Sequence, residues 1–88
     1  LLFVEDGCHA LGAWCDGRRV GSVADLTCFS FHPVKHITTA EGGMIATTNP
    51  EWAALLRTLR NHGIPTDHRA RERAGVWEYD MTALGYNY

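Results

Sequence analysis

Three short apolar or alternating segments predict a β-sheet in the first half of the chain. Leu1–Val4 is a continuous apolar run, which suits a strand covered on both faces. Leu26–Phe31 alternates and is rich in aromatic and β-branched residues, with the small side chains of Cys28 and Ser30 on one face. Met44–Thr47 is a third apolar run. The pattern therefore predicts strands that need other elements to cover them.

The clearest helix is expected from Glu51 to Asn61. Asn49 can cap it, Pro50 suits the first helical position, and Gly63 suits a position just beyond the end. Four apolar residues fall at the i, i+3, i+4 and i+7 spacing of one buried stripe: Trp52, Leu55, Leu56 and Leu59. We interpret this helix as structural.

Shorter signals fill the rest of the chain. Cys8–Trp14 is expected to form a short helical piece, and Asp16-Gly17 predicts a tight turn. Thr66–Ala74 is polar and charged with little periodicity, which favours a loop. Trp77–Leu84 alternates loosely and is rich in aromatic residues.

Composition places the chain among ordinary globular proteins, with 45% hydrophobic and 20% charged residues. The net charge of −2 argues against nucleic-acid binding. No apolar run approaches the roughly 18 residues of a membrane span, so no membrane partner is expected. The three cysteines form no CxxC pair, which favours reduced thiols in the cytoplasm. The chain opens inside an apolar run without methionine, so residues 1–88 are expected to be an internal fragment with no complete domain.

Lys35 is the first candidate for chemistry, because it is the single lysine of the chain, where arginine is otherwise used. A desolvated lysine becomes an amine nucleophile that can form a Schiff base with a carbonyl. A pyridoxal phosphate site needs in addition a carboxylate against the ring nitrogen and donors for the phosphate. Asp6 and Ser30, each at a predicted strand end, are of the right kinds.

A zinc-binding module is an alternative of another class. Its potential ligands are Cys8, Cys15, Cys28, His32 and His36. Structural zinc sites usually pair ligands two to four residues apart, whereas six residues separate Cys8 from Cys15. Pro33 also prevents His32 and His36 from sharing a regular helix. We therefore expect no metal site.

Five separated motifs occur in an order that resembles the DegT/DnrJ/EryC1/StrS family of nucleotide-sugar aminotransferases. They are Val4–Ala13 with Gly21-Ser22, Cys28–Lys35, Ile37–Met44, Leu59–Ile64 and Leu84–Tyr88. The resemblance covers nearly the whole chain. Two small departures are Gly7-Cys8, where alanine or serine is common, and His36 after the lysine.

The resemblance implies an α/β fold with a mostly parallel central sheet. The chain would be an internal part of the large domain of the fold-type I, aspartate-aminotransferase-like enzymes, with pyridoxal 5′-phosphate as cofactor. Lys35 would form the Schiff base and move the proton of the amino donor, and Asp6 would pair with the pyridinium nitrogen. His9 would pack against the cofactor near its ring hydroxyl, and Ser30 would hold the phosphate. Asn87 would reach the phosphate in the neighbouring subunit, so that a homodimer shares its active sites.

Within the family, the chain is most similar to the transaminases of pseudaminic acid biosynthesis. The resemblance implies a UDP-linked 4-keto-6-deoxy-hexose as substrate, glutamate as donor, and a 4-amino sugar for cell-surface polysaccharide or glycan as product. Two alternatives remain open. Some family members use pyridoxamine phosphate for sugar dehydration and carry histidine at the lysine position, which Lys35 argues against. A binding-only relative without catalysis is the other.

Overall fold

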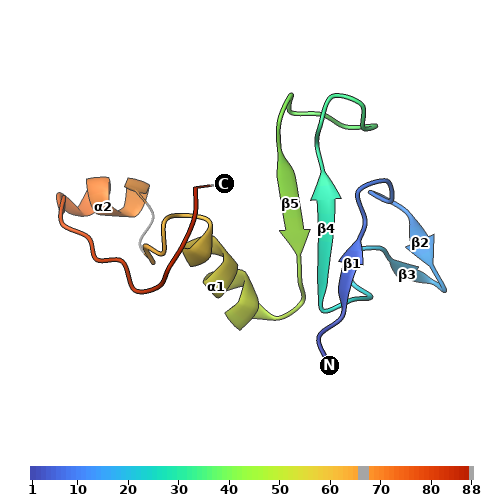
Figure 1. The fold of residues 1–88 in the computed structure, drawn as a ribbon, viewed down its shortest axis with the longest axis horizontal. Helices are drawn as coiled ribbons and strands as arrows, with labels where there is room; N and C mark the ends of the chain where they lie inside the picture. The colour runs from blue at the N-terminus through green and yellow to red at the C-terminus, as the bar shows by residue number, and fades with distance from the viewer. Residues whose placement is uncertain (66–67, 88) are drawn as a thin grey trace. The chain divides into compact units, whose positions relative to one another are not determined.

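The computed structural model describes residues 1–65 and 68–87 of the protein (Figure 1). The chain divides into two compact units, Leu1–Pro50 and Glu51–Tyr88. Strands make up the regular structure of the first unit, and nearly all helical residues lie in the second. Among the described residues, no helix combines the length and the apolar character that crossing a membrane would require.

The first unit is built on a three-stranded sheet in the order β1-β4-β5. β1 (Val4–Asp6) pairs in parallel with β4 (Leu26–Ser30), and β4 pairs antiparallel with β5 (Gly43–Ala46). The second and third predicted strands are thus confirmed. The sheet of the described residues is mixed rather than mostly parallel. The loop after β4 reverses the direction of the chain, so that β5 runs antiparallel beside β4 (Figure 1).

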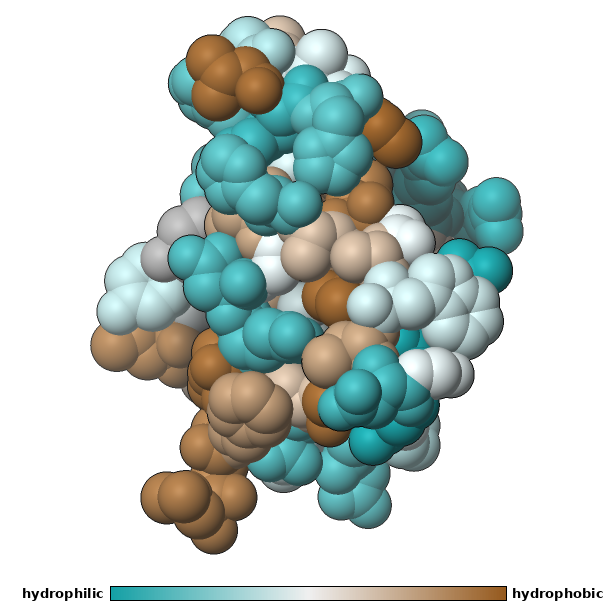
Figure 2. Space-filling view, turned by 90° about the vertical axis from the view of Figure 1, so that its right-hand side faces the viewer, coloured by the Kyte–Doolittle hydropathy of each residue, from teal (hydrophilic) through white to brown (hydrophobic). Residues whose placement is uncertain are grey.

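The first strand begins later than the apolar pattern predicts. It includes the carboxylates Glu5 and Asp6, whereas Leu1–Phe3 lies outside it. The ladder with β4 sets these limits, since Leu26 N–H donates to the Phe3 carbonyl at 3.3 Å and Gly7 N–H donates to the Cys28 carbonyl at 2.8 Å. Figure 2 shows hydrophobic side chains projecting at the lower edge of the face in view, where Figure 1 places the N-terminus.

The two faces of β4 differ in burial, as the alternation predicts. Thr27 is 0% exposed and Phe29 is 6% exposed, and they form one face. Gly21 packs directly on the Phe29 ring, and Ala24 is buried as well. The opposite face carries Cys28 and Ser30, which are only half-buried. The small side chains of β4 therefore stay accessible.

A two-stranded hairpin lies between β1 and β4 in the sequence. β2 (Trp14–Cys15) pairs with β3 (Arg18–Arg19) around Asp16-Gly17. Both turn residues have positive φ, 48° and 73°, which is the type I′ geometry that an Asp-Gly pair favours. The predicted turn is confirmed.

The prediction of a short helical piece over Cys8–Trp14 is wrong. This stretch forms successive turns, with hydrogen bonds from Ala10 N–H to the Gly7 carbonyl and from Ala13 N–H to the Ala10 carbonyl. Gly12 has a φ of 84°, which a right-handed helix cannot contain.

The second unit contains α1 (Pro50–Leu59) and α2 (His68–Ala74). The first helix is confirmed, although none of its residues is fully buried within the described chain. The predicted loop over Thr66–Ala74 is wrong, since His68–Ala74 is helical; Thr66 and Asp67 lie outside the described residues. Alanine, arginine and glutamate favour a helix even without an apolar stripe.

The end of α1 is fastened to the last segment of the chain by backbone hydrogen bonds. Tyr86 N–H donates to the Leu59 carbonyl at 2.7 Å, and His62 N–H donates to the Tyr86 carbonyl at 2.8 Å. Asn61 and Asn87 form an antiparallel bridge. The segments that follow α1 and that end the described chain are therefore hydrogen-bonded to each other although they are distant in sequence.

Two glycines make this approach possible. A Cβ atom on Gly63 would collide with the carbonyl group of Ala83, and one on Gly85 would collide with the backbone of His62 and Gly63. Gly63 also has a φ of 72°, at which a side chain is strained.

Gly63→Ala is expected to lower the free energy of unfolding of the purified protein by about 2–4 kcal/mol, because alanine adds both backbone strain and a collision. Gly75→Ala is the matched control, since Gly75 has a φ of 66° but nothing within 4 Å of the Cβ position. The control should lose only about 1 kcal/mol. Urea denaturation measures both variants, and equal losses would contradict the close packing at Gly63.

Candidate active site

Asp6 lies at the end of β1, where the chain turns back against β4. Its Oδ1 accepts a hydrogen bond of 3.0 Å from the backbone N–H of Cys8. In the parallel register Asp6 is paired with Cys28, so both side chains lie on the half-open face of the sheet. A carboxylate thus stands at the strand end, as predicted.

Lys35 lies in the loop between β4 and β5, just after the strand end at Ser30. The loop begins with a turn in which Lys35 N–H donates to the His32 carbonyl at 2.9 Å. His32 N–H donates to Ser30 Oγ at 3.3 Å, which ties the hydroxyl to the same turn. Further along, the Phe31 carbonyl accepts from Thr38 Oγ1 and from Thr39 N–H, both at 3.0 Å. The loop is therefore braced on both sides of the lysine.

His9 and Lys35 are in contact although they are 26 positions apart in sequence. Lys35 Nζ lies 2.7 Å from His9 Nε2, within hydrogen-bond distance. His36 Nε2 makes a second, longer contact of 3.4 Å with the Leu11 carbonyl oxygen. The loop that carries the lysine is thereby held against the turn that follows β1.

The electrostatics of the site favour an ionised carboxylate. A hydrogen bond from the Cys8 side chain lowers the pKa of Asp6, and the Cys8 backbone N–H acts in the same direction. Desolvation raises that pKa, and the positive charge of Lys35 lowers it again. The same partnership raises the pKa of the Cys8 thiol, mainly through its hydrogen bond to Asp6. The carboxyl group of Asp6 is thus kept ionised and can pair with a positively charged group.

The first unit contains four of the five predicted site residues, Asp6, His9, Ser30 and Lys35. His9 contacts Lys35, and Asp6 is near enough for the charge of Lys35 to lower its pKa, whereas Ser30 is linked to Lys35 only through the turn that begins the loop. Asn87 belongs to the second unit, where its backbone pairs with Asn61 and its side chain is exposed. Its assignment to a cofactor phosphate stays a prediction.

Cys8 is a residue of the site that sequence reasoning did not assign. The family resemblance marks it only as a departure from the pattern, and it is also one potential zinc ligand. A signal was available, because it lies two residues after Asp6, the distance at which an Asp side chain accepts a hydrogen bond from its own backbone.

Within residues 1–65 and 68–87, no three His, Cys, Asp or Glu side chains are grouped so that they could hold a metal ion. The zinc alternative therefore gains no support from the described structure. All three cysteines are free thiols.

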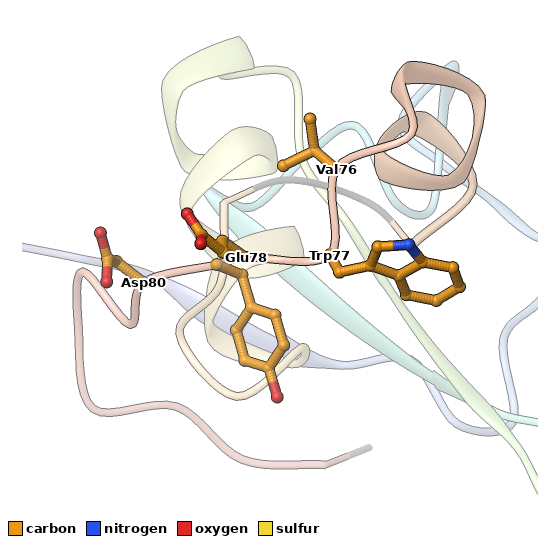
Figure 3. Close-up of a pocket in the computed structure, with 5 residues that line it drawn as sticks. Val76, Trp77, Glu78 and Asp80 are labelled. Carbon is orange, nitrogen blue, oxygen red and sulfur yellow. The ribbon is translucent and has the colours of Figure 1, made fainter.

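An open hollow of the second unit is lined by Val76–Asp80 (Figure 3). Trp77 and Asp80 point in opposite directions there (Figure 3). Tyr79 is instead covered by the Arg71 guanidinium, 4.4 Å from the ring centroid. The hollow contains none of the predicted site residues, so the arrangement around Lys35 remains the better candidate for chemistry.

Solved structures of sugar aminotransferases have the same fold. Spr1654 of Streptococcus pneumoniae, described as a sugar aminotransferase and solved in its PMP form, matches with a TM-score of 0.80 and 41% identity over 99% of this chain and 23% of its own. PseC of Helicobacter pylori, an aminotransferase of pseudoaminic acid biosynthesis, matches with a TM-score of 0.83 and 34% identity over 100% of this chain and 22% of its own. The α/β class predicted from the sequence is confirmed.

A sequence relative agrees with this class. The UDP-4-amino-4,6-dideoxy-N-acetyl-beta-L-altrosamine transaminase of Campylobacter jejuni serotype O:23/36 is 48% identical over the whole chain, which spans 22% of that relative. Residues 1–88 match the sequence profile of the DegT/DnrJ/EryC1/StrS aminotransferase family, and the chain belongs to this family. The resemblance drawn from its motifs is confirmed.

The carboxyl group of Asp6 is expected to titrate below its ordinary pKa of 3.8 in the cofactor-free protein. A lowered pKa stabilises the fold only while the group is ionised, so this contribution is present above the ordinary value and is lost as the pH falls through the lowered one. Carbon-13 NMR of the Asp6 carboxyl measures the titration. A midpoint at or above 3.8 would contradict the hydrogen bonding described for Cys8.

Proposed function

We propose that this chain is part of a pyridoxal 5′-phosphate-dependent aminotransferase that acts on a nucleotide-linked 4-keto sugar. Glutamate is the proposed amino donor, and the product is a 4-amino sugar used for cell-surface polysaccharide or glycan. Family membership supports transamination, and the activity of the Campylobacter jejuni relative supports a UDP-linked 4-amino sugar. Spr1654 structures in PLP and PMP forms support the cofactor.

The contact between Lys35 and His9, next to an ionised Asp6, is the observation on which the proposal rests. The cofactor needs an amine, an anion and phosphate donors, and the first unit offers all three kinds of group. Asp6 offers the carboxylate for a protonated ring nitrogen, and Lys35 the amine. Ser30 Oγ lies in the turn that leads to Lys35, where it can bind a phosphate oxygen. The residues present therefore fit pyridoxal phosphate.

When bound, pyridoxal phosphate supplies an electron sink that allows an amino group to be detached from one substrate and attached to another. Lys35 holds the cofactor through its amine and then moves the proton at Cα of the amino donor. Asp6 keeps the ring nitrogen protonated by remaining ionised. His9, which contacts Lys35 in the cofactor-free protein, packs against the cofactor near its ring hydroxyl. Each role requires the β4–β5 loop to stay folded against the turn after β1.

The chain spans less than a quarter of the relatives it matches, so the remaining assignments are also proposals. We infer that residues 1–88 are an internal part of a cofactor-binding large domain. Asn87 would bind the cofactor phosphate of a second subunit, which makes the enzyme a homodimer with shared active sites. Free thiols at Cys8, Cys15 and Cys28 support the cytoplasm as its location.

Lys35→Ala is expected to lower the rate of amino transfer from L-glutamate at least about 10³-fold, since it removes both the covalent attachment of the cofactor and the proton carrier. In the wild-type protein, borohydride reduction in the presence of pyridoxal phosphate should leave a pyridoxyl label on the Lys35 peptide. Lys35→Arg is the control that keeps the charge and removes the nucleophile, and it should also fail. Labelling elsewhere, or near wild-type turnover in either variant, would overturn the proposal.

Asp6→Asn is expected to slow the reaction with L-glutamate by about 10²-fold, because the ring nitrogen loses its charged partner. Stopped-flow absorbance of the loaded protein measures this step. Asp16→Asn, in the hairpin turn, is the control, since asparagine tolerates the positive φ there. An Asp6→Asn variant as fast as this control would remove Asp6 from the mechanism.

A further inference from the structure

The 2.7 Å contact between Lys35 Nζ and His9 Nε2 decides where the protons of both side chains can lie. An ammonium group has hydrogens to donate and no acceptor, whereas an imidazole nitrogen either carries a hydrogen or accepts one. Two nitrogen atoms at this distance share one hydrogen, so a protonated lysine requires His9 Nε2 to be without its own. Moving that hydrogen across the same bond gives a neutral amine and a protonated imidazole, with no change in total charge.

The neutral amine is the form of Lys35 that can act as a nucleophile. An amine attacks a carbon atom through its lone pair, which the ammonium form lacks. The proton must therefore leave Nζ first, and it must go to a base within hydrogen-bond distance. Imidazole suits this task, because it gains and loses a proton near neutral pH.

The two acidic groups near the lysine are less suited to take its proton. Asp6 is near enough for the charge of Lys35 to act on it, but within residues 1–65 and 68–87 it makes no hydrogen bond with the Lys35 amine. The lowered pKa of Asp6 also makes its carboxylate a weak base. The pKa of Cys8 is raised, so its thiol stays protonated and offers no thiolate to accept a proton.

Two further histidines lie in the loop that carries the lysine, but neither contacts its amine. His36 Nε2 lies 3.4 Å from the Leu11 carbonyl oxygen, which can only accept, so this nitrogen carries a hydrogen. His32 Nδ1 accepts from the Val34 N–H at 3.4 Å. Among the described residues, His9 is therefore the base in hydrogen-bond contact with the lysine amine.

Backbone turns hold both members of the pair. Lys35 N–H donates to the His32 carbonyl, and Ala10 N–H donates to the Gly7 carbonyl across the turn that carries His9, each at 2.9 Å. Lys35 is half-buried, whereas His9 is exposed. An exposed imidazole can exchange its proton with water, so it can accept again after each transfer.

We propose that His9 is the proton acceptor that converts Lys35 into a nucleophile, so that its amine can attack the aldehyde carbon of an incoming ligand. The Lys35 ammonium gives one proton to His9 and its nitrogen forms a bond to the carbon. His9 then passes that proton to the former aldehyde oxygen, and a second hydrogen from the nitrogen joins it. The oxygen leaves as water, and a carbon–nitrogen double bond remains.

The identity of that aldehyde as pyridoxal phosphate rests on the proposed function. The transfer of a proton from Lys35 to His9 does not, since their contact belongs to the cofactor-free protein. The two parts are therefore tested separately.

The proton acceptor is tested in the cofactor-free protein by reaction with trinitrobenzenesulfonate near pH 8, followed by peptide mapping. Only a free amine attacks this reagent, and Lys35 is the single lysine of residues 1–88. His9→Gln keeps a hydrogen-bond acceptor that cannot take a proton, and it should slow labelling of Lys35 at least about 5-fold. His62→Asn, in the second unit, is the control that should keep the wild-type rate, since asparagine tolerates the φ of 57° there. A wild-type rate in His9→Gln would overturn the proposal.

Chemical rescue separates proton transfer from a structural role. His9→Ala removes the imidazole and should slow labelling of Lys35 by a similar factor. Free imidazole should restore most of the rate, because it fits the space that is left and accepts a proton, whereas pyrazole has the same shape but is a far weaker base and should not. The wild-type protein with each additive gives the background, and thermal unfolding of both His9 variants shows whether the fold is retained. Equal rates with the two additives would contradict a role as proton acceptor.

The part that concerns the cofactor is tested by mixing cofactor-free protein with pyridoxal phosphate and trapping samples with borohydride at successive times. The pyridoxyl label on Lys35 should accumulate at least about 5-fold more slowly in His9→Gln than in the wild type. Equal rates would remove His9 from attachment of the cofactor. If the wild-type protein takes up no label on Lys35, the proposed function fails, whereas the reaction with trinitrobenzenesulfonate still decides whether His9 takes the proton of Lys35.

Discussion

The parallel pairing of β1 with β4 is the constraint on which the candidate site depends. Its register places Glu5 beside Thr27 and Asp6 beside Cys28. The fully buried Thr27 hydroxyl donates to Glu5 Oε2 at 2.8 Å, so the pair is satisfied inside the unit. A slip of one residue would turn Asp6 to the covered face and leave Thr27 without its acceptor. The same pairing therefore stabilises the sheet and presents the carboxylate.

Local chemistry explains which parts of the fold were predictable. The alternation of β4 and the Asp16-Gly17 turn were predicted correctly, because the side-chain period and the turn geometry are properties of a few adjacent residues. The limits of β1 were not, since hydrogen bonds to a distant strand set them. The helix His68–Ala74 was missed because it has strong helix formers but no apolar stripe.

The residues of the candidate site were predictable, but the contacts between them were not. Asp6, Ser30 and Lys35 could be proposed from residue type and from their places at strand ends, and the family motifs supplied His9. The 2.7 Å contact between Lys35 and His9 could not be predicted, because it depends on how the β4–β5 loop folds back. Sequence thus indicated the groups, and tertiary structure shows which of them touch.

We propose that the end of β1 and the β4–β5 loop together hold the cofactor. A crystal structure of the purified protein grown with pyridoxal phosphate is the most direct test. We expect continuous density from Lys35 Nζ to the cofactor carbon, and an Asp6 oxygen about 2.7–2.9 Å from the ring nitrogen. A ring bound away from Asp6, or a lysine that stays on His9 with no density joining it to the cofactor, would contradict it.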